Sequence, residues 1–216
     1  MLVIAPHADD ETLGCGATIA RARRAGRRVV VAIVSDGSQS VISAAITPRQ
    51  LADLRIAEAV AAVAILGVDR GDVVFLGFPD TALEQNQRAI AEVLRHRIGE
   101  LQPAEIFSPY GIDGHRDHRA VAAALTTLFE AGALTCPVYE YPVWFWPRRA
   151  MRHLAMPATL RRLRKVSTAG LLDRKRQAMD AYRSQRENFT GEPAAWFLTE
   201  TVMRDFFQPE ELFFQR

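Results

Sequence analysis

The amino-terminal stretch Leu2-Val3-Ile4-Ala5-Pro6-His7-Ala8-Asp9-Asp10-Glu11 joins an apolar run to four titratable side chains within five residues. Small residues follow it, from Thr12 to Ala17. This order predicts a buried strand, a sharp polar turn and a helix. Ligands bind beyond the carboxyl ends of strands in open α/β sheets. A histidine beside adjacent carboxylates is costly to bury without a positive partner, so the stretch indicates a metal site.

A second stretch, Gly114-His115-Arg116-Asp117-His118, also follows a strand-like run, here at residues 105–109. Three of the five histidines of the chain lie in these two stretches. Either stretch alone would be typical of a capped turn with solvent-facing polar residues, but two in matching positions argue for one site. Imidazole and carboxylate together suit zinc, which keeps an open position for water in catalytic sites.

The two motifs resemble those of the PIG-L, or LmbE-like, family of zinc-dependent N-acetylglucosaminyl deacetylases. Further segments match the family in order, and the resemblance covers about residues 2–190: Ser35-Asp36-Gly37, Arg55-x-x-Glu58, Leu76-Gly77-Phe78-Pro79-Asp80, Lys175-x-x-Ala178 and Ser184-Gln185. The resemblance implies a metal-dependent hydrolase that removes an acetyl group from an N-acetylglucosamine-type sugar or conjugate by zinc-activated water. It also implies one Zn²⁺ per chain, although other divalent metals could serve.

Apolar runs alternate with helical patterns along the chain. Strands are expected at residues 2–6, 29–35, 72–76, 105–108 and 137–141, and helices at about 12–25, 48–66, 84–101, 119–131 and 172–187. Continuous apolar strands joined by helices predict a mostly parallel sheet covered on both faces. The expected fold class is therefore α/β, a three-layer α/β/α Rossmann-like domain, and residues 1–216 are expected to form a single domain.

Residues 144–170 break this alternation. Their apolar residues keep no steady period, and the segment is rich in arginine, including Arg148, Arg149 and Arg152. The favoured interpretation is a solvated excursion between the last strand and the last helix, because arginine is abundant throughout the chain. A lid, or a patch for an anionic substrate or a membrane surface, is the alternative.

Composition excludes several classes of protein. A net charge of +2 gives no reason to expect nucleic acid as a partner. Cys15 and Cys136, the only two cysteines, form neither a disulfide framework nor a metal motif. No signal-peptide pattern and no membrane-length apolar run is present, so a cytoplasmic protein is expected. The expected partner is a small acylated amino sugar or conjugate, and the oligomeric state stays open.

Chemistry and resemblance assign the same roles to the two motifs. The expected zinc ligands are His7, Asp10 and His118. Successive side chains point in different directions, so Asp9 cannot easily bind the same ion as Asp10 and is expected to act as the general base. His115 as imidazolium would stabilise the oxyanion and protonate the leaving amine. Asp117 would orient and charge His115, or would only complement the dipole of a helix N-terminus.

Arg55 and Asp80 match family positions that contact the sugar, and Arg116 is expected at the pocket rim. Ala8 and Arg116 replace prolines that the family usually carries, but neither position is a ligand. Asp113 stands where some relatives have a tyrosine, so an oxyanion-stabilising tyrosine is not expected. Arginines at the rim would favour an N-acetylhexosamine with a phosphate-bearing or otherwise large aglycone.

Other functions fit the sequence less well. The chain lacks the third glycine of the dinucleotide-binding fingerprint and has no G-x-S-x-G nucleophile motif. A metal-dependent phosphoesterase would use the same ligand types, but two-metal versions need more carboxylates. A non-catalytic sugar-binding relative would have no need of Asp9 and His115.

Overall fold

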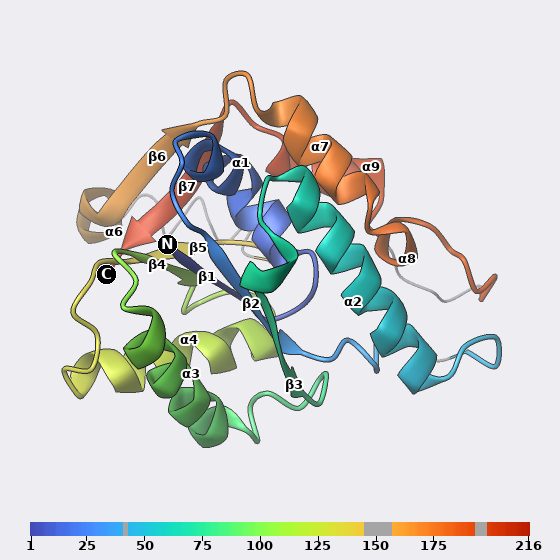
Figure 1. Ribbon diagram of the computed structural model, residues 1–216, viewed down its shortest axis with the longest axis horizontal. Coiled ribbons are helices and arrows are strands. Elements are labelled where there is room, and N and C mark those ends of the chain that lie inside the picture. The colour runs from blue at the N-terminus through green and yellow to red at the C-terminus, as the bar shows by residue number, and fades with distance from the viewer. Residues whose placement is uncertain (41–42, 145–156, 193–197) are drawn as a thin grey trace.

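The computed structural model of the chain describes residues 1–40, 43–144, 157–192 and 198–216. Within these ranges seven strands form one sheet in the order β3-β2-β1-β4-β5-β7-β6 (Figure 1). The strands are β1 (Leu2–Ala5), β2 (Val30–Ser35), β3 (Val73–Phe78), β4 (Ile106–Pro109), β5 (Val138–Tyr141), β6 (Leu163–Ser167) and β7 (Glu210–Gln215). Neighbouring strands from β3 to β5 are parallel, whereas β7 is antiparallel to both β5 and β6.

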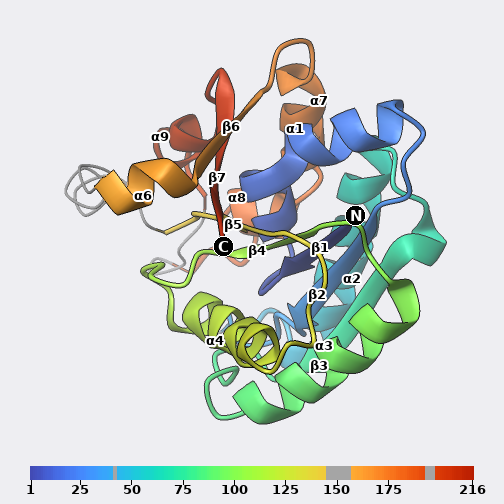
Figure 2. The ribbon, with the colours of Figure 1, turned by 90° about the vertical axis from the view of Figure 1, so that its left-hand side faces the viewer.

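Helices cover both faces of the sheet, which confirms the expected three-layer α/β/α fold. Helices α1, α2 and α7 lie on one face, and α3 and α4 lie on the other (Figures 1 and 2). The helical segments are α1 (Asp10–Arg24), α2 (Pro48–Ile65), α3 (Gln87–Leu101), α4 (Arg116–Glu130), α6 (Pro157–Arg162), α7 (Leu172–Asp180), α8 (Arg183–Arg186) and α9 (Glu200–Met203), with short 3₁₀ turns η1 (Arg70–Asp72) and η2 (Arg204–Phe206).

Alternate side chains of the central strands enter two separate cores. Val3 and Ala5 of β1 pack with Val31 in the core beneath α1, α2 and α7. Leu2 and Ile4 pack in the core against α3 and α4. Successive side chains of a strand point to opposite faces, so a strand buried on both faces must be apolar throughout. This explains the continuous apolar runs in the sequence.

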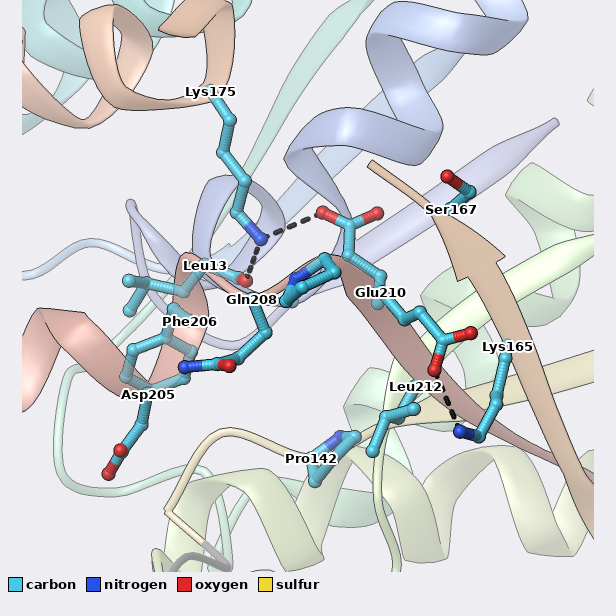
Figure 3. Close-up of a pocket in the computed structure, with 13 residues that line it drawn as sticks. Leu13, Pro142, Lys165, Ser167, Lys175, Asp205, Phe206, Gln208, Glu210 and Leu212 are labelled. Carbon is cyan, nitrogen blue, oxygen red and sulfur yellow. Dashed lines mark hydrogen bonds and ion pairs between the residues drawn. The ribbon is translucent and has the colours of Figure 1, made fainter. Parts of the chain in front are cut away.

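Two glycines let α1 approach its neighbours closely. A Cβ atom at Gly14 would clash with the ring of Tyr141, and one at Gly16 would lie 2.9 Å from Cγ of Lys175. Lys175, fully buried, donates from Nζ to the carbonyl of Leu13 and to Glu211 Oε1, both at 2.8 Å (Figure 3). The glycines therefore serve packing, and the buried ion pair ties α7 and β7 to α1.

The sequence prediction missed the antiparallel side of the sheet. Residues 144–170 were expected to form a solvated excursion, yet their described part contains α6 and the edge strand β6. Strand β6 exposes most of its side chains and pairs with β7 through its backbone, so it has no apolar pattern to detect. The expected helix at 172–187 is interrupted between α7 and α8. Residues 145–156, with Arg148, Arg149 and Arg152, lie outside the described residues.

In the described ranges, no helix combines the length and the apolar character needed to cross a membrane.

Candidate metal centre and active site

The two histidine motifs meet where the direction of strand connections reverses. Strand β1 lies between β2 and β4, so the ends of β1 and β4 flank the crevice where open α/β sheets bind ligands. His7 follows β1, while His115 caps α4 and His118 lies in its first turn. The ring centroids are 4.8 Å apart for His7 and His115, 5.4 Å for His7 and His118, and 5.1 Å for His115 and His118.

One oxygen of Asp10 joins two of these rings. Asp10 Oδ2 lies 3.2 Å from His7 Nδ1 and 3.0 Å from His118 Nε2. The backbone N–H of His7 donates to the same oxygen at 2.9 Å. Ligand atoms at about 2.1 Å from a tetrahedral zinc ion are about 3.4 Å apart. Asp10 Oδ2 therefore lies from a ring nitrogen of each histidine at about the distance that separates two ligand atoms of one ion.

The opposite ring nitrogens of the two histidines face carboxylates. His7 Nε2 lies 3.3 Å from Asp117 Oδ2 and 3.4 Å from Asp80 Oδ1. His118 Nδ1 lies 3.6 Å from Asp113 Oδ1. A metal-ligating histidine usually turns its other ring nitrogen to a carboxylate or carbonyl, which fixes the tautomer and the ring orientation. The two remaining ring nitrogens, Nδ1 of His7 and Nε2 of His118, both face Asp10 Oδ2.

The donor set fits a divalent cation. Both ring nitrogens of His118 are buried, and neither makes a well-directed hydrogen bond within the described residues. Burial lowers the pKa of His118, but Asp10 and Asp113 outweigh it and raise the pKa to about 9. Burial would raise the pKa of Asp10, yet His118 and His7 hold it well below its usual range. The site thus concentrates negative charge around orphaned imidazole nitrogens, as a cation site does.

Other groupings of possible ligands share His7. Two groups each offer three possible ligand atoms, one per residue, that all lie within 4.8 Å of one another. The first group is His7, His115 and His118, and the second is His7, Asp80 and Asp117. The expected set of His7, Asp10 and His118 is not one of these two groupings of described residues, but Asp10 contacts both rings.

Asp9 occupies an unusual backbone conformation. It is the N-cap of α1 with φ 126°, a region that residues with a Cβ rarely adopt. Such strain persists only where surrounding contacts enforce it, and it concentrates at functional sites. Asp9 is 6% exposed. Its burial, followed by the charge of Asp10, raises the pKa of the Asp9 carboxyl well above its ordinary value. A carboxylate with raised pKa is a stronger proton acceptor.

Glu11 is the contact that enforces this turn. The fully buried carboxylate accepts the backbone N–H of Asp9 at 3.1 Å, the hydroxyl of Thr12, and the hydroxyl of Tyr182 at 2.6 Å. Gln185 adds a hydrogen bond from Nε2 to the carbonyl of Ala8. The segment from α7 to α8 therefore holds the metal loop. Sequence reasoning matched Gln185 to a motif but gave it no role, and it did not single out Tyr182 as a functional residue.

Asp117 lies in the first turn of α4, as its alternative role at a helix N-terminus requires, and its charge acts on His115 without a hydrogen bond from its carboxylate to that ring. Asp117 presents its backbone N–H, not its carboxylate, to Nδ1 of His115 at 3.2 Å. The carboxylate instead faces His7 and accepts the N–H groups of Thr81 and Leu83. The α4 N-terminus causes this, because His115 caps the helix with its ring nitrogen. Asp117 therefore orients His7.

This arrangement also disfavours the expected imidazolium form of His115. Burial, followed by the charges of His7 and His118, lowers the pKa of His115 to about 4. A cation held by the two other histidines acts in the same direction. Because Nδ1 accepts from the backbone, a neutral His115 carries its proton on Nε2. It can then act as an uncharged N–H donor.

The three expected substrate contacts lie in different settings. Arg55 is buried, donates from Nη2 to Ser40 Oγ at 3.0 Å, and has an Nε without a partner among the described residues. Asp80, expected to contact substrate, faces His7 and accepts the N–H groups of Gln39 and Thr81. Arg116 is exposed. In the described part of residues 157–170, Arg162 pairs with Glu140 of β5 and Lys165 pairs with Glu210 of β7.

A large cavity lies away from this chemistry. It measures about 670 Å³ and is bordered by α1, β6, β7 and η2 (Figure 3). Leu13 and Gly14 border it, but none of the expected ligands or catalytic residues does. The candidate metal site is therefore identified by its side chains and not by this cavity.

Comparisons with known proteins agree with the motifs and the fold. The family model described as "PIG-L: GlcNAc-PI de-N-acetylase" matches residues 2–129. The chain is 32% identical over 123 residues to a diacetylchitobiose deacetylase of Thermococcus kodakarensis, covering 55% of this chain and 45% of that protein. It is 31% identical over 169 residues to a 1D-myo-inositol 2-acetamido-2-deoxy-α-D-glucopyranoside deacetylase of Mycolicibacterium gilvum. This match covers 68% of this chain and 58% of that protein. The chain thus spans about half the length of these curated relatives.

Among solved structures, an N,N'-diacetylchitobiose deacetylase from Pyrococcus horikoshii superposes with a TM-score of 0.75 at 20% identity, covering 100% of this chain and 82% of that one. At this identity the likeness shows a shared fold. The family model covers more than half of the chain and includes both histidine motifs. The chain belongs to the PIG-L (GlcNAc-PI de-N-acetylase) family.

Proposed function

We propose that the chain is a metal-dependent N-deacetylase that hydrolyses the acetamide of an N-acetylglucosamine-type sugar or conjugate. The observation that carries this proposal is the convergence of His7, Asp10 and His118 beside a buried, strained Asp9. Both curated relatives described above are deacetylases of acetylated amino sugars by name. We further propose that residues 1–216 act as one domain and that the ion is zinc, because the donors are two imidazoles and a carboxylate.

His7 Nδ1, Asp10 and His118 Nε2 would hold the ion. A cation bound there acidifies water and polarises an acyl oxygen. Asp9 accepts the proton of the attacking water, since its buried carboxylate favours the protonated state. His115 donates its Nε2–H to the oxyanion that forms on the acyl carbon. The C–N bond then breaks, and the leaving amine takes the proton that Asp9 received.

Arg55, Asp80 and Arg116 would contribute in different ways to substrate. Arg55 is close enough to Asp9 and Asp80 to interact with both electrostatically, and its orphaned Nε is a free donor for a sugar hydroxyl. Asp80 also holds His7, so its substitution would affect the metal as well as the sugar. Arg116 would meet the outer part of the substrate.

The test measures metal content and acetate release together. Asp9→Asn should abolish turnover of N-acetylglucosamine conjugates while metal stays near one per chain. His7→Ala, Asp10→Ala and His118→Ala should lose metal and activity together. Metal loss in Asp9→Asn would make Asp9 a ligand and overturn its role as base.

Asp10→Ala and His115→Ala form a matched pair that separates the two ligand sets that include both His7 and His118. If His7, Asp10 and His118 bind the ion, His115→Ala keeps the metal and loses about two to four orders of magnitude in rate. If the three histidines bind it, His115→Ala loses the metal and Asp10→Ala retains it. Absence of acetate release from a panel of free, nucleotide-linked and lipid-linked N-acetylhexosamines, with metal bound, would refute the deacetylase.

A further inference from the structure

Asp113 lies between the metal site and the end of β5. Its side chain is 1% exposed and accepts three backbone N–H groups at 2.9 Å: that of His115 at Oδ1, and those of Val143 and Trp144 at Oδ2. The sequence placed Asp113 only at a position where some relatives have a tyrosine. The buried carboxylate thus joins its own loop, which follows β4, to the residues that follow β5.

The same Oδ1 atom lies 3.6 Å from His118 Nδ1. His118 is fully buried and turns Nε2 toward Asp10. Within the described residues, Asp113 is the carboxylate that faces the outer nitrogen of this ring. At this distance the carboxylate acts through its charge: it favours a proton on Nδ1, which leaves Nε2 for a metal and makes the ring a better donor.

The loop of Asp113 also fits tightly against the end of β5. A Cβ atom at Gly114 would lie 2.5 Å from the carbonyl oxygen of Trp144, so a side chain there requires the two loops to separate. Asp113 Oδ2 holds the two N–H groups of this same β5 extension. The hydrogen bonds and the close contact act together, because each keeps residues 143–144 against the loop that follows β4.

We propose that Asp113 is a positioning residue that sets the orientation of His118 for metal binding and links it to the backbone of Val143 and Trp144. This role depends on one part of the proposed function, namely that His118 binds the metal. Asp113 touches neither the substrate nor the ion. It acts through the imidazole, so its loss should weaken metal binding before it changes the chemical step.

The experiment measures the affinity of the metal-free full-length chain for Zn²⁺ and Co²⁺ by competition with a chromophoric chelator. Asp113→Asn should bind both ions about 10–100-fold more weakly and change the visible spectrum of bound Co²⁺. Glu58→Gln is the matched comparison, since this buried carboxylate also holds a backbone N–H and a hydroxyl, those of Ser184, but pairs with no histidine among the described residues. It should lower the unfolding midpoint and leave the metal affinity within about twofold of the parent.

A second pair keeps the proposal testable if Asp113→Asn does not fold. Gly114→Ala leaves the carboxylate in place but pushes on Trp144, and should also weaken metal binding. Gly111→Ala, in the same loop, meets no atom closer than 3.6 Å and should not. Metal affinity unchanged in Asp113→Asn, or reduced equally in Glu58→Gln, would overturn the positioning role. A parent chain that binds no metal would remove the site itself, whereas a metal-binding chain without deacetylase activity would refute the proposed function alone.

Discussion

Replacement of Tyr182 by phenylalanine tests whether the carboxyl-terminal helices hold the catalytic turn. Tyr182 is fully buried and its hydroxyl donates to Glu11 Oε1 at 2.6 Å. Tyr182→Phe deletes that donor without changing the volume of the core. Glu11 keeps the N–H of Asp9 and the hydroxyl of Thr12, so the turn is weakened and not abolished.

The expected loss follows from the type of hydrogen bond. One made to a charged group contributes about 1.5–3 kcal/mol to stability. For a chain of 216 residues, a loss of about 2 kcal/mol lowers the melting temperature by about 4–8 °C. Tyr141 provides a matched control, because it is also fully buried but donates to the neutral carbonyl of Ile4 at 2.7 Å. Tyr141→Phe should lose about 1 kcal/mol, or about 2–4 °C.

Calorimetry of the two metal-loaded variants measures these losses, and initial rates measure the consequence for Asp9. Because Glu11 enforces the strained turn, Tyr182→Phe should lower kcat about tenfold or more with metal content unchanged, whereas Tyr141→Phe should affect kcat less. A melting temperature no lower in Tyr182→Phe than in Tyr141→Phe, with full activity, would refute the idea that Tyr182 holds the turn.

Two further predictions concern packing and pH. Gly14→Ala should lower the free energy of unfolding in urea by about 1–3 kcal/mol, because the new Cβ clashes with the Tyr141 ring. Gly99→Ala is the control: this residue lies in a helix with open space around it, so the change should raise the free energy of unfolding by about 0.5–1 kcal/mol. In metal-free protein the pKa of His118 is raised to about 9, so the folded state binds this proton more tightly than the unfolded state, whose histidine has a pKa of about 6.5. The resulting stabilisation of the folded state is complete below pH 6.5 and is lost as the pH rises through 9. The midpoint of urea unfolding should therefore fall across this range. A midpoint that stays constant, or that falls equally in His118→Ala, would contradict this prediction.

The sequence alone determined the parallel half of the sheet and the ligand-bearing loops. Strands buried on both faces require apolar runs, and β1 and β2 at the centre of the sheet carry the clearest ones, so their positions follow from composition along the chain. His7 and His118 were detectable because costly polar residues follow two such runs. The matching position of both motifs after a strand then placed them at one edge, and the structure brings them together.

Only the tertiary structure determined the partners of the residues around those ligands. Asp117 contacts His7 through its carboxylate and His115 through its backbone N–H, because His115 caps the helix that Asp117 begins. Strand β6 depends on backbone pairing with β7 and leaves no apolar period in the sequence. The contacts of Glu11 with Tyr182 and of Asp113 with Val143 join residues that are far apart in the chain. The local sequence shows which polar residues would be costly to bury. The packing of elements that are distant in the chain determines which partners offset that cost.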